Sequence, residues 1–162
     1  MRFGPLAFLG LLLLSACGGA PRTGGLGGGS DLECAPFARH STGIELYGEA
    51  YTWWDQAQGR YARSSEPVPG GVLVFRRSAR LPSGHVAVVN EQVSAREIRV
   101  TQSNWVHRRV TRNEPVIDTS PGNDWSQVRV WWEPVQAMGS SAYQTYGFIS
   151  PRGDLVAGLN RR

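Results

Sequence analysis

The sequence predicts an α+β domain in which N-terminal helices pack on an antiparallel β-sheet. Apolar residues with helical spacing are confined to residues 34–58, and short runs of strand-forming residues follow from residue 72 onward. The chain has 162 residues, of which 41% are apolar. This is the size of one domain with a substantial core, so extended disorder is excluded.

Two helices are predicted at the start of this domain. The first covers residues 34–41, with Pro36 in its first turn and Gly43 placed to end it. The second covers residues 48–58, where the apolar spacing indicates a buried face before Gly59. Turn clusters rich in Pro and Gly separate the later segments, and alternating or apolar runs predict strands at 72–75, 85–89, 97–104, 116–117, 128–132 and 146–149.

Residues 1–16 have the pattern of a lipoprotein signal peptide. A basic start precedes an apolar run over residues 3–14, which is too short to span a bilayer, since a helix needs about 20 residues for that. Leu14-Ser15-Ala16-Cys17 resembles a lipobox, whose cleavage would leave Cys17 as a lipidated N-terminus. The alternative is an ordinary secretory signal in which the cysteine is incidental. We expect an exported protein with a lipid anchor in the cell envelope.

Residues 17–30 combine this lipidated cysteine with a glycine-rich linker, which behaves as a tether of about 20 Å. Gly18, rather than an aspartate, follows the anchor, and by analogy with Gram-negative lipoproteins this favours the outer membrane or periplasmic face over the inner membrane. The folded domain is expected at 31–150. Residues 151–162 have little to bury and are expected to form a flexible tail.

The charged residues exclude several functions. All 17 basic residues are arginines, which rules out Schiff-base chemistry and a P-loop lysine. The arginines are scattered, so we expect no nucleic-acid partner. Two cysteines cannot form a four-cysteine zinc site, and we expect neither a metal nor a cofactor.

The candidate chemistry depends on Cys34 and His85. Cys34 begins a predicted helix, where unpaired backbone N–H groups favour a thiolate, although the charge of Glu33 opposes it. His85 opens an apolar strand beside a turn, whereas His40 points elsewhere on its helix and His107 adjoins two arginines. The alternatives remain a buried structural cysteine and a hydrogen-bonded core histidine.

A third group is expected from the hairpin that follows His85. An antiparallel pair of 85–90 and 97–104, turning near Ser94-Ala95, places Val89 opposite Val100 and Asn104 opposite His85. Gln102 lies on the same face and would be opposite His85 after a two-residue shift. In either register a neutral amide can accept a hydrogen bond from the imidazole.

Five segments, taken in order, resemble a CHAP domain, the cysteine- and histidine-dependent amidohydrolases and peptidases. The resemblance runs over about residues 31–132. Its segments are Glu33-Cys34-Ala35-Pro36-Phe37-Ala38-Arg39, residues 48–59 with Trp54, residues 69–75, Gly84-His85-Val86-Ala87-Val88-Val89, and residues 98–105 with Gln102, Asn104 and Trp105.

This resemblance implies a papain-like fold with Cys34 as nucleophile, His85 as base and Asn104 as the amide that orients the ring. Many members have a glutamate where this chain has Gln102, which cannot stabilise an imidazolium by charge. Trp105 and Trp54 are candidates for a substrate groove; the other tryptophans are expected in the core.

The implied function is a cell-envelope cysteine amidohydrolase or endopeptidase that cleaves amide bonds in peptidoglycan peptides. One alternative is a non-catalytic or weakly active structural or binding lipoprotein, and another is an amidase acting on a small peptide conjugate. The expected partners are peptidoglycan or a peptide, and the membrane through the lipid anchor. The oligomeric state is left open.

Overall fold

The computed structural model describes Met1 and residues 32–151. Apart from Met1 and Pro151, the expected signal peptide, Cys17, the linker and the C-terminal tail lie outside the described residues. Within residues 32–151, no helix has the length and apolar character needed to cross a membrane.

Antiparallel strands make up most of the fold and form one sheet in the order β1-β8-β2-β3-β4-β5-β6-β7. Because β8 pairs with both β2 and β6, the strands β2, β3, β4, β5, β6 and β8 close on themselves as a barrel. The strands are β1 (Ala62–Ser64), β2 (Val72–Phe75), β3 (His85–Ser94), β4 (Glu97–Ser103), β5 (Val110–Asp118), β6 (Gln127–Trp132), β7 (Ala137–Met138) and β8 (Tyr143–Ser150).

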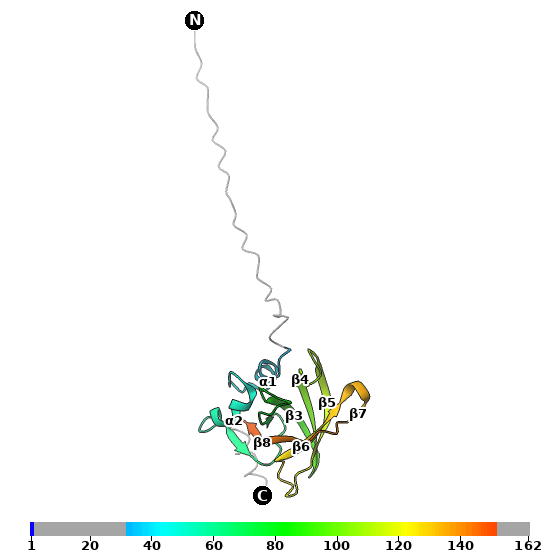
Figure 1. Cartoon of the computed structure of the whole chain (residues 1–162). Coiled ribbons are helices and arrows are strands. Elements are labelled where there is room, and N and C mark those ends of the chain that lie inside the picture. The colour runs from blue at the N-terminus through cyan, green and yellow to red at the C-terminus, as the bar shows by residue number, and fades with distance from the viewer. Residues whose placement is uncertain (2–31, 152–162) are drawn as a thin grey trace.

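Helix α1 (Cys34–Thr42) confirms the first predicted helix and packs against β3 and β4. The second predicted helix is wrong in extent, because the 3-10 turn η1 (Ala50–Thr52) leads into the single-turn α2 (Trp53–Gln56). The backbone N–H of Tyr51 donates to the carbonyl of Ser83, 3.2 Å away in the loop before β3. This N–H is therefore not used in a hydrogen bond within a longer helix. The expected layer of helices on a sheet is therefore reduced to α1 and short turns beside a barrel (Figure 1).

Side chains alternate along β2 and β3 between two hydrophobic clusters. Val72, Val74, Val86 and Val88 pack with α1 and α2 outside the barrel. Leu73, Phe75, Ala87 and Val89 point into the barrel, where they meet Ile98 and Val100 of β4 and Val116 of β5. This alternation places His85, which has the same parity as Ala87, on the interior side at the start of β3.

The β3–β4 hairpin has the predicted register at its centre. Val89 is paired with Val100, and Val88 with Thr101. The register shifts twice toward the turn, so the turn itself falls at Ala95-Arg96.

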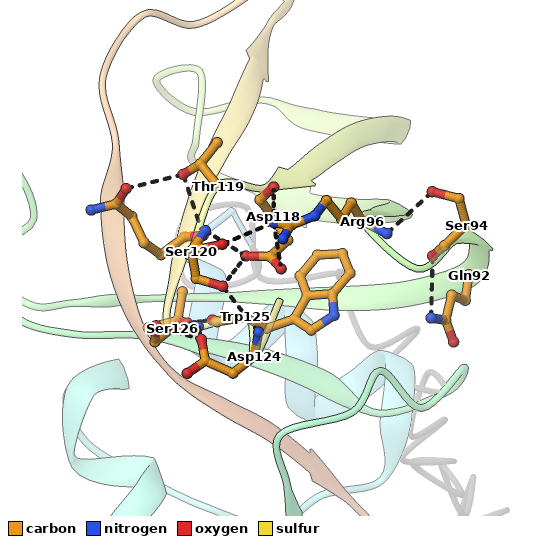
Figure 2. A network of polar contacts seen from close by, with 11 residues as sticks. Gln92, Ser94, Arg96, Asp118, Thr119, Ser120, Asp124, Trp125 and Ser126 are labelled. Atoms are coloured by element: carbon orange, nitrogen blue, oxygen red, sulfur yellow. Dashed lines mark hydrogen bonds and ion pairs between the residues drawn. The ribbon is translucent and has the colours of Figure 1, made fainter. Parts of the chain in front are cut away.

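A polar network fixes the turn end of this hairpin, at the opposite end of β3 from His85 (Figure 2). Asp118 is buried, and its Oδ1 accepts hydrogen bonds from the backbone N and the Oγ of Ser120, at 2.8 and 2.6 Å. Arg96 donates to the carbonyl of Ser120 at 2.9 Å and forms an ion pair with Asp118 at 3.4 Å. The loop after β5 is thereby tied to the hairpin turn.

Gly84 supplies a first prediction, because its backbone has φ +67° and lies against Tyr51. A Cβ at this position would lie 2.7 Å from the Tyr51 backbone N and 2.8 Å from its Cβ. Gly84→Ala should therefore lower the free energy of unfolding by about 3 kcal/mol, from left-handed strain and overpacking together. Urea unfolding measures this change.

The matched control is Gly70→Ala, because Gly70 has φ +83° and nothing within 4 Å of the added Cβ. In this variant only the left-handed backbone strain should lower the free energy of unfolding, by about 1 kcal/mol. Equal losses in the two variants would contradict the close packing of Gly84 against Tyr51.

Candidate active site

A pocket of about 380 Å³ opens where the start of α1 meets the start of β3. Three of the residues expected at the site, Cys34, His85 and Asn104, line this pocket together with Trp105. The remaining lining residues come from the residue before α1, the loop before β3, and strands β6 and β8: Glu33, Arg80, Leu81, Pro82, Ser83, Gly84, Trp132 and Tyr143.

Cys34 is a free cysteine at the first position of α1. Burial raises the pKa of its thiol above the ordinary value, and the negative charge of Glu33 raises it further. Hydrogen bonds from the backbone N–H groups of Val86, Ala35 and Cys34 itself lower this pKa and only partly offset the increase. The contact with Val86 places the sulfur beside the peptide group that follows His85.

His85 is 3% exposed, and its ring lies between aromatic side chains. The ring centroid is 5.4 Å from that of Phe75 and 5.1 Å from that of Trp105. Burial lowers the pKa of the imidazole from 6.5 to about 4, although a hydrogen bond to Gln102 opposes this shift. The ring is therefore a neutral imidazole at neutral pH.

The amide that holds this ring belongs to Gln102. Its Oε1 lies 2.9 Å from His85 Nε2, and Gln102 is fully buried. In the β3–β4 register Gln102 is the diagonal neighbour of His85, within reach of a long side chain. Because Nε2 faces Gln102, Nδ1 is the ring nitrogen that points away from this amide.

Asn104 lines the pocket, but its contacts differ from the expected contact with His85. Its Nδ2 donates to Glu33 Oε2 at 2.7 Å, and its Oδ1 accepts from the backbone N–H of Arg108 at 2.8 Å. The physical reason is that β4 ends at Ser103 and Asn104 has φ +61°, so its side chain leaves the face shared with His85.

The tryptophans also divide differently from the expectation. Trp105 lines the pocket against His85, as the groove hypothesis requires. Trp54 lies elsewhere, stacked on Tyr146 at 5.9 Å with the guanidinium of Arg63 over its ring. Trp132, expected in the core, is 38% exposed at the end of β6 and lines the pocket.

These groups suit nucleophilic chemistry. A thiol at a helix N-terminus and an imidazole with one nitrogen held by an amide define the class of thiol–imidazole sites used for acyl transfer. In the described part of the chain, no cluster of three or more His, Cys, Asp or Glu side chains could hold a metal ion.

Comparison with known proteins agrees with this class. Residues 25–104 match the CHAP domain family, and this supports the resemblance drawn from the sequence motifs. CHAP domains are generally cysteine- and histidine-dependent hydrolases, which include peptidoglycan amidases and peptidases, and the match suggests a papain-like fold. The matched segment contains Cys34, His85, Gln102 and Asn104. No curated protein matches the chain.

The buried neutral imidazole predicts a pH dependence of stability. Between pH 6.5 and about 4 the unfolded chain binds a proton at residue 85 that the folded protein excludes, so stability falls as pH falls through this window. The full shift corresponds to roughly 3 kcal/mol of unfolding free energy. His85→Gln should therefore lose less stability than the wild type between pH 7 and 4, as measured by urea unfolding. The control, His40→Gln, replaces an exposed histidine of α1 and should follow the wild-type curve; parallel curves for all three proteins would contradict the prediction.

The charge of Glu33 predicts a second titration effect. Glu33→Gln removes a negative charge that raises the pKa of the Cys34 thiol, so this pKa should fall. The rate of alkylation by iodoacetamide at a series of pH values, followed at the Cys34 peptide by mass spectrometry, measures it. Glu45→Gln, an exposed position after α1, is the control, and an unchanged or higher midpoint in Glu33→Gln would count against the assignment.

Proposed function

We propose that this chain is a cell-envelope cysteine hydrolase that cleaves amide bonds in peptidoglycan peptides, with Cys34 as nucleophile and His85 as base. The observation that carries the proposal is the pocket that both side chains line, in which Nε2 of His85 is held by Gln102. Nδ1 would then be the nitrogen that serves the thiol. The substrate class follows from the match to the CHAP domain family. Export and a lipid anchor at Cys17 belong to the same proposal.

The reaction would proceed by acyl transfer. His85 Nδ1 takes the proton from Cys34, and the sulfur attacks the amide carbonyl to form a C–S bond. The resulting oxyanion lies near the start of α1, where the Cys34 N–H is a donor. The C–N bond then breaks as His85 returns its proton to the leaving amine. A water molecule, deprotonated by His85, releases the acid from the thioester and restores the thiol.

The resting state of the pair would be uncharged. Burial raises the pKa of the Cys34 thiol and lowers that of His85, and both shifts favour a neutral thiol beside a neutral imidazole. The proton would therefore move as the sulfur attacks, with His85 acting as a general base.

The surroundings of the pocket suit an extended peptide. A second pocket, of about 430 Å³, shares Trp105, Trp132 and Tyr143 with the first, so the two adjoin and together would make a groove. Arg80 is exposed and lines the first pocket, where its guanidinium would favour a substrate that carries a carboxylate. Stem peptides of peptidoglycan combine such carboxylates with apolar methyl groups.

The second candidate function is that of a binding lipoprotein with weak or no activity. The same two pKa shifts favour it, because both disfavour the thiolate–imidazolium pair on which many thiol hydrolases depend. Glu33, adjacent to the nucleophile, adds to this effect. Such a protein would retain the groove and bind wall peptides without cleaving them.

Digestion of purified sacculi separates the two functions. The wild type should release soluble fragments, and Cys34→Ala or His85→Ala should reduce the initial rate at least 1000-fold, since removing one member of a nucleophile–base pair costs about this much or more. Mass spectrometry of the products identifies the new amine and the new carboxyl group, and thereby the bond that is cut.

His107→Gln is the control for this experiment, because His107 is exposed on the turn after β4. Digestion by Cys34→Ala at the wild-type rate would overturn the hydrolase proposal. Binding of the wild type to sacculi with no released fragments would establish the second candidate in its place.

A further inference from the structure

We propose that Glu114 is a positioning residue of this site, which orients the amide of Gln102 and thereby holds His85 with Nε2 protonated and Nδ1 free. Its catalytic meaning rests on the proposed function, whereas the arrangement of the three side chains does not. No sequence pattern points to Glu114.

The three side chains come from adjacent strands. His85 begins β3, Gln102 lies near the end of β4, and Glu114 lies in β5. Gln102 Oε1 is 2.9 Å from His85 Nε2, and Gln102 Nε2 donates to Glu114 Oε2 over 3.4 Å. All three are buried, with Glu114 only 6% exposed. They form a continuous polar row in which the carboxylate lies farthest from the thiol.

The carboxylate determines which way the amide points. A carboxylate accepts hydrogen bonds and does not donate them, so the NH₂ group of Gln102 must face Glu114. The reverse orientation would place the amide oxygen of Gln102 against a carboxylate oxygen. With its NH₂ group committed, Gln102 presents Oε1 to the ring, and this oxygen can only accept. His85 Nε2 must therefore carry the hydrogen, which leaves the lone pair on Nδ1.

The backbone places Glu114 for this contact. Val100 is paired with Glu114 and Gln102 with Thr111, so Arg112 and Asn113 together oppose Thr101 in a β-bulge. Asn113, the second residue of the bulge, has a left-handed backbone with φ +54°. A bulge re-aims the side chains beside it, and here it turns a glutamate into the barrel behind Gln102.

A purely structural role accounts poorly for this residue. Burying a carboxylate is costly unless it is paired. The ion pairs within residues 32–151 join Arg96 to Asp118, Arg99 to Glu97 and Arg109 to Glu133. Glu114 instead contacts the amide that holds the imidazole, where its charge would also favour the imidazolium formed during the reaction.

Other charged and titratable groups surround the ring and must stay constant in a test. Cys34 and Glu33 lie at the start of α1, Arg80 lies in the loop before β3, and Tyr143 lies on β8. All of them line the pocket, whereas Glu114 contacts the side of Gln102 that faces away from His85. Substitution at position 114 therefore changes the support of the ring without changing the pocket lining.

The test is nitrogen NMR of the His85 ring at pH 7.5, in a chain carrying His40→Gln and His107→Gln so that His85 gives the only histidine signals. With Glu114 in place, Nε2 should be the protonated nitrogen and Nδ1 the unprotonated one. Glu114→Gln lets either orientation of Gln102 be satisfied, so the Nδ1-protonated tautomer should become populated. On sacculi, kcat should fall about tenfold with KM little changed.

The double variant Gln102→Glu, Glu114→Gln keeps one carboxylate and one amide but exchanges their places. The carboxylate then accepts directly from Nε2–H, so a single tautomer and most of the activity should return, whereas a merely structural role would predict no rescue. Glu91→Gln, at an exposed position of β3, is the matched control. If Glu114→Gln does not fold, the tautomer of the parent protein still tests the proposal.

An Nδ1-protonated ring in the parent protein, or a single unchanged tautomer in Glu114→Gln, would overturn the proposal. The tautomer is measured without substrate. If the parent protein digests no sacculi, the proposed function fails while the role of Glu114 is still decided by the spectrum.

Discussion

Alternation along β3 is the constraint on which the site depends. His85 and Val86 are consecutive, so the imidazole enters the barrel while the side chain of Val86 packs beneath the helices and its N–H contacts the sulfur of Cys34. A single strand thus locates both reacting groups. A slip of one residue would exchange the two faces, move His85 toward the helices and separate it from Gln102. The apolar side chains that follow on β3 hold the register against such a slip.

The electrostatics of the pocket reflect a compromise between packing and reactivity. Aromatic rings around His85 exclude water and keep the imidazole neutral, which makes it a weak base, and burial of Cys34 makes the thiol a weak acid. Groups that stabilise the charged forms only as charge develops would then contribute most to rate. The amides at the start of α1 could serve the sulfur in this way, and the row behind Nε2 could serve the ring.

Sequence patterns predicted the features that depend on local periodicity. Alternation was sufficient to predict the β3–β4 hairpin and the pairing of Val89 with Val100. Pro36 in the first turn and Gly43 at the end were sufficient to predict α1. The sequence could not show whether Gln102 or Asn104 contacts the His85 ring, because this depends on the left-handed backbone of Asn104 after β4. The turn before the short α2 is held by a hydrogen bond from Tyr51 to a distant loop, and the direction of the Glu114 side chain is set by a β-bulge. Neither feature produces a periodic pattern in the sequence.

Closure of the barrel has a further consequence for how copies of this chain behave when crowded together. In the described region, the two strands at the ends of the strand order are β1 and β7, with 3 and 2 residues. Strands this short offer a poor template for strand addition from a neighbouring molecule. At high local concentration, these two ends of the sheet would therefore contribute little to edge-to-edge aggregation.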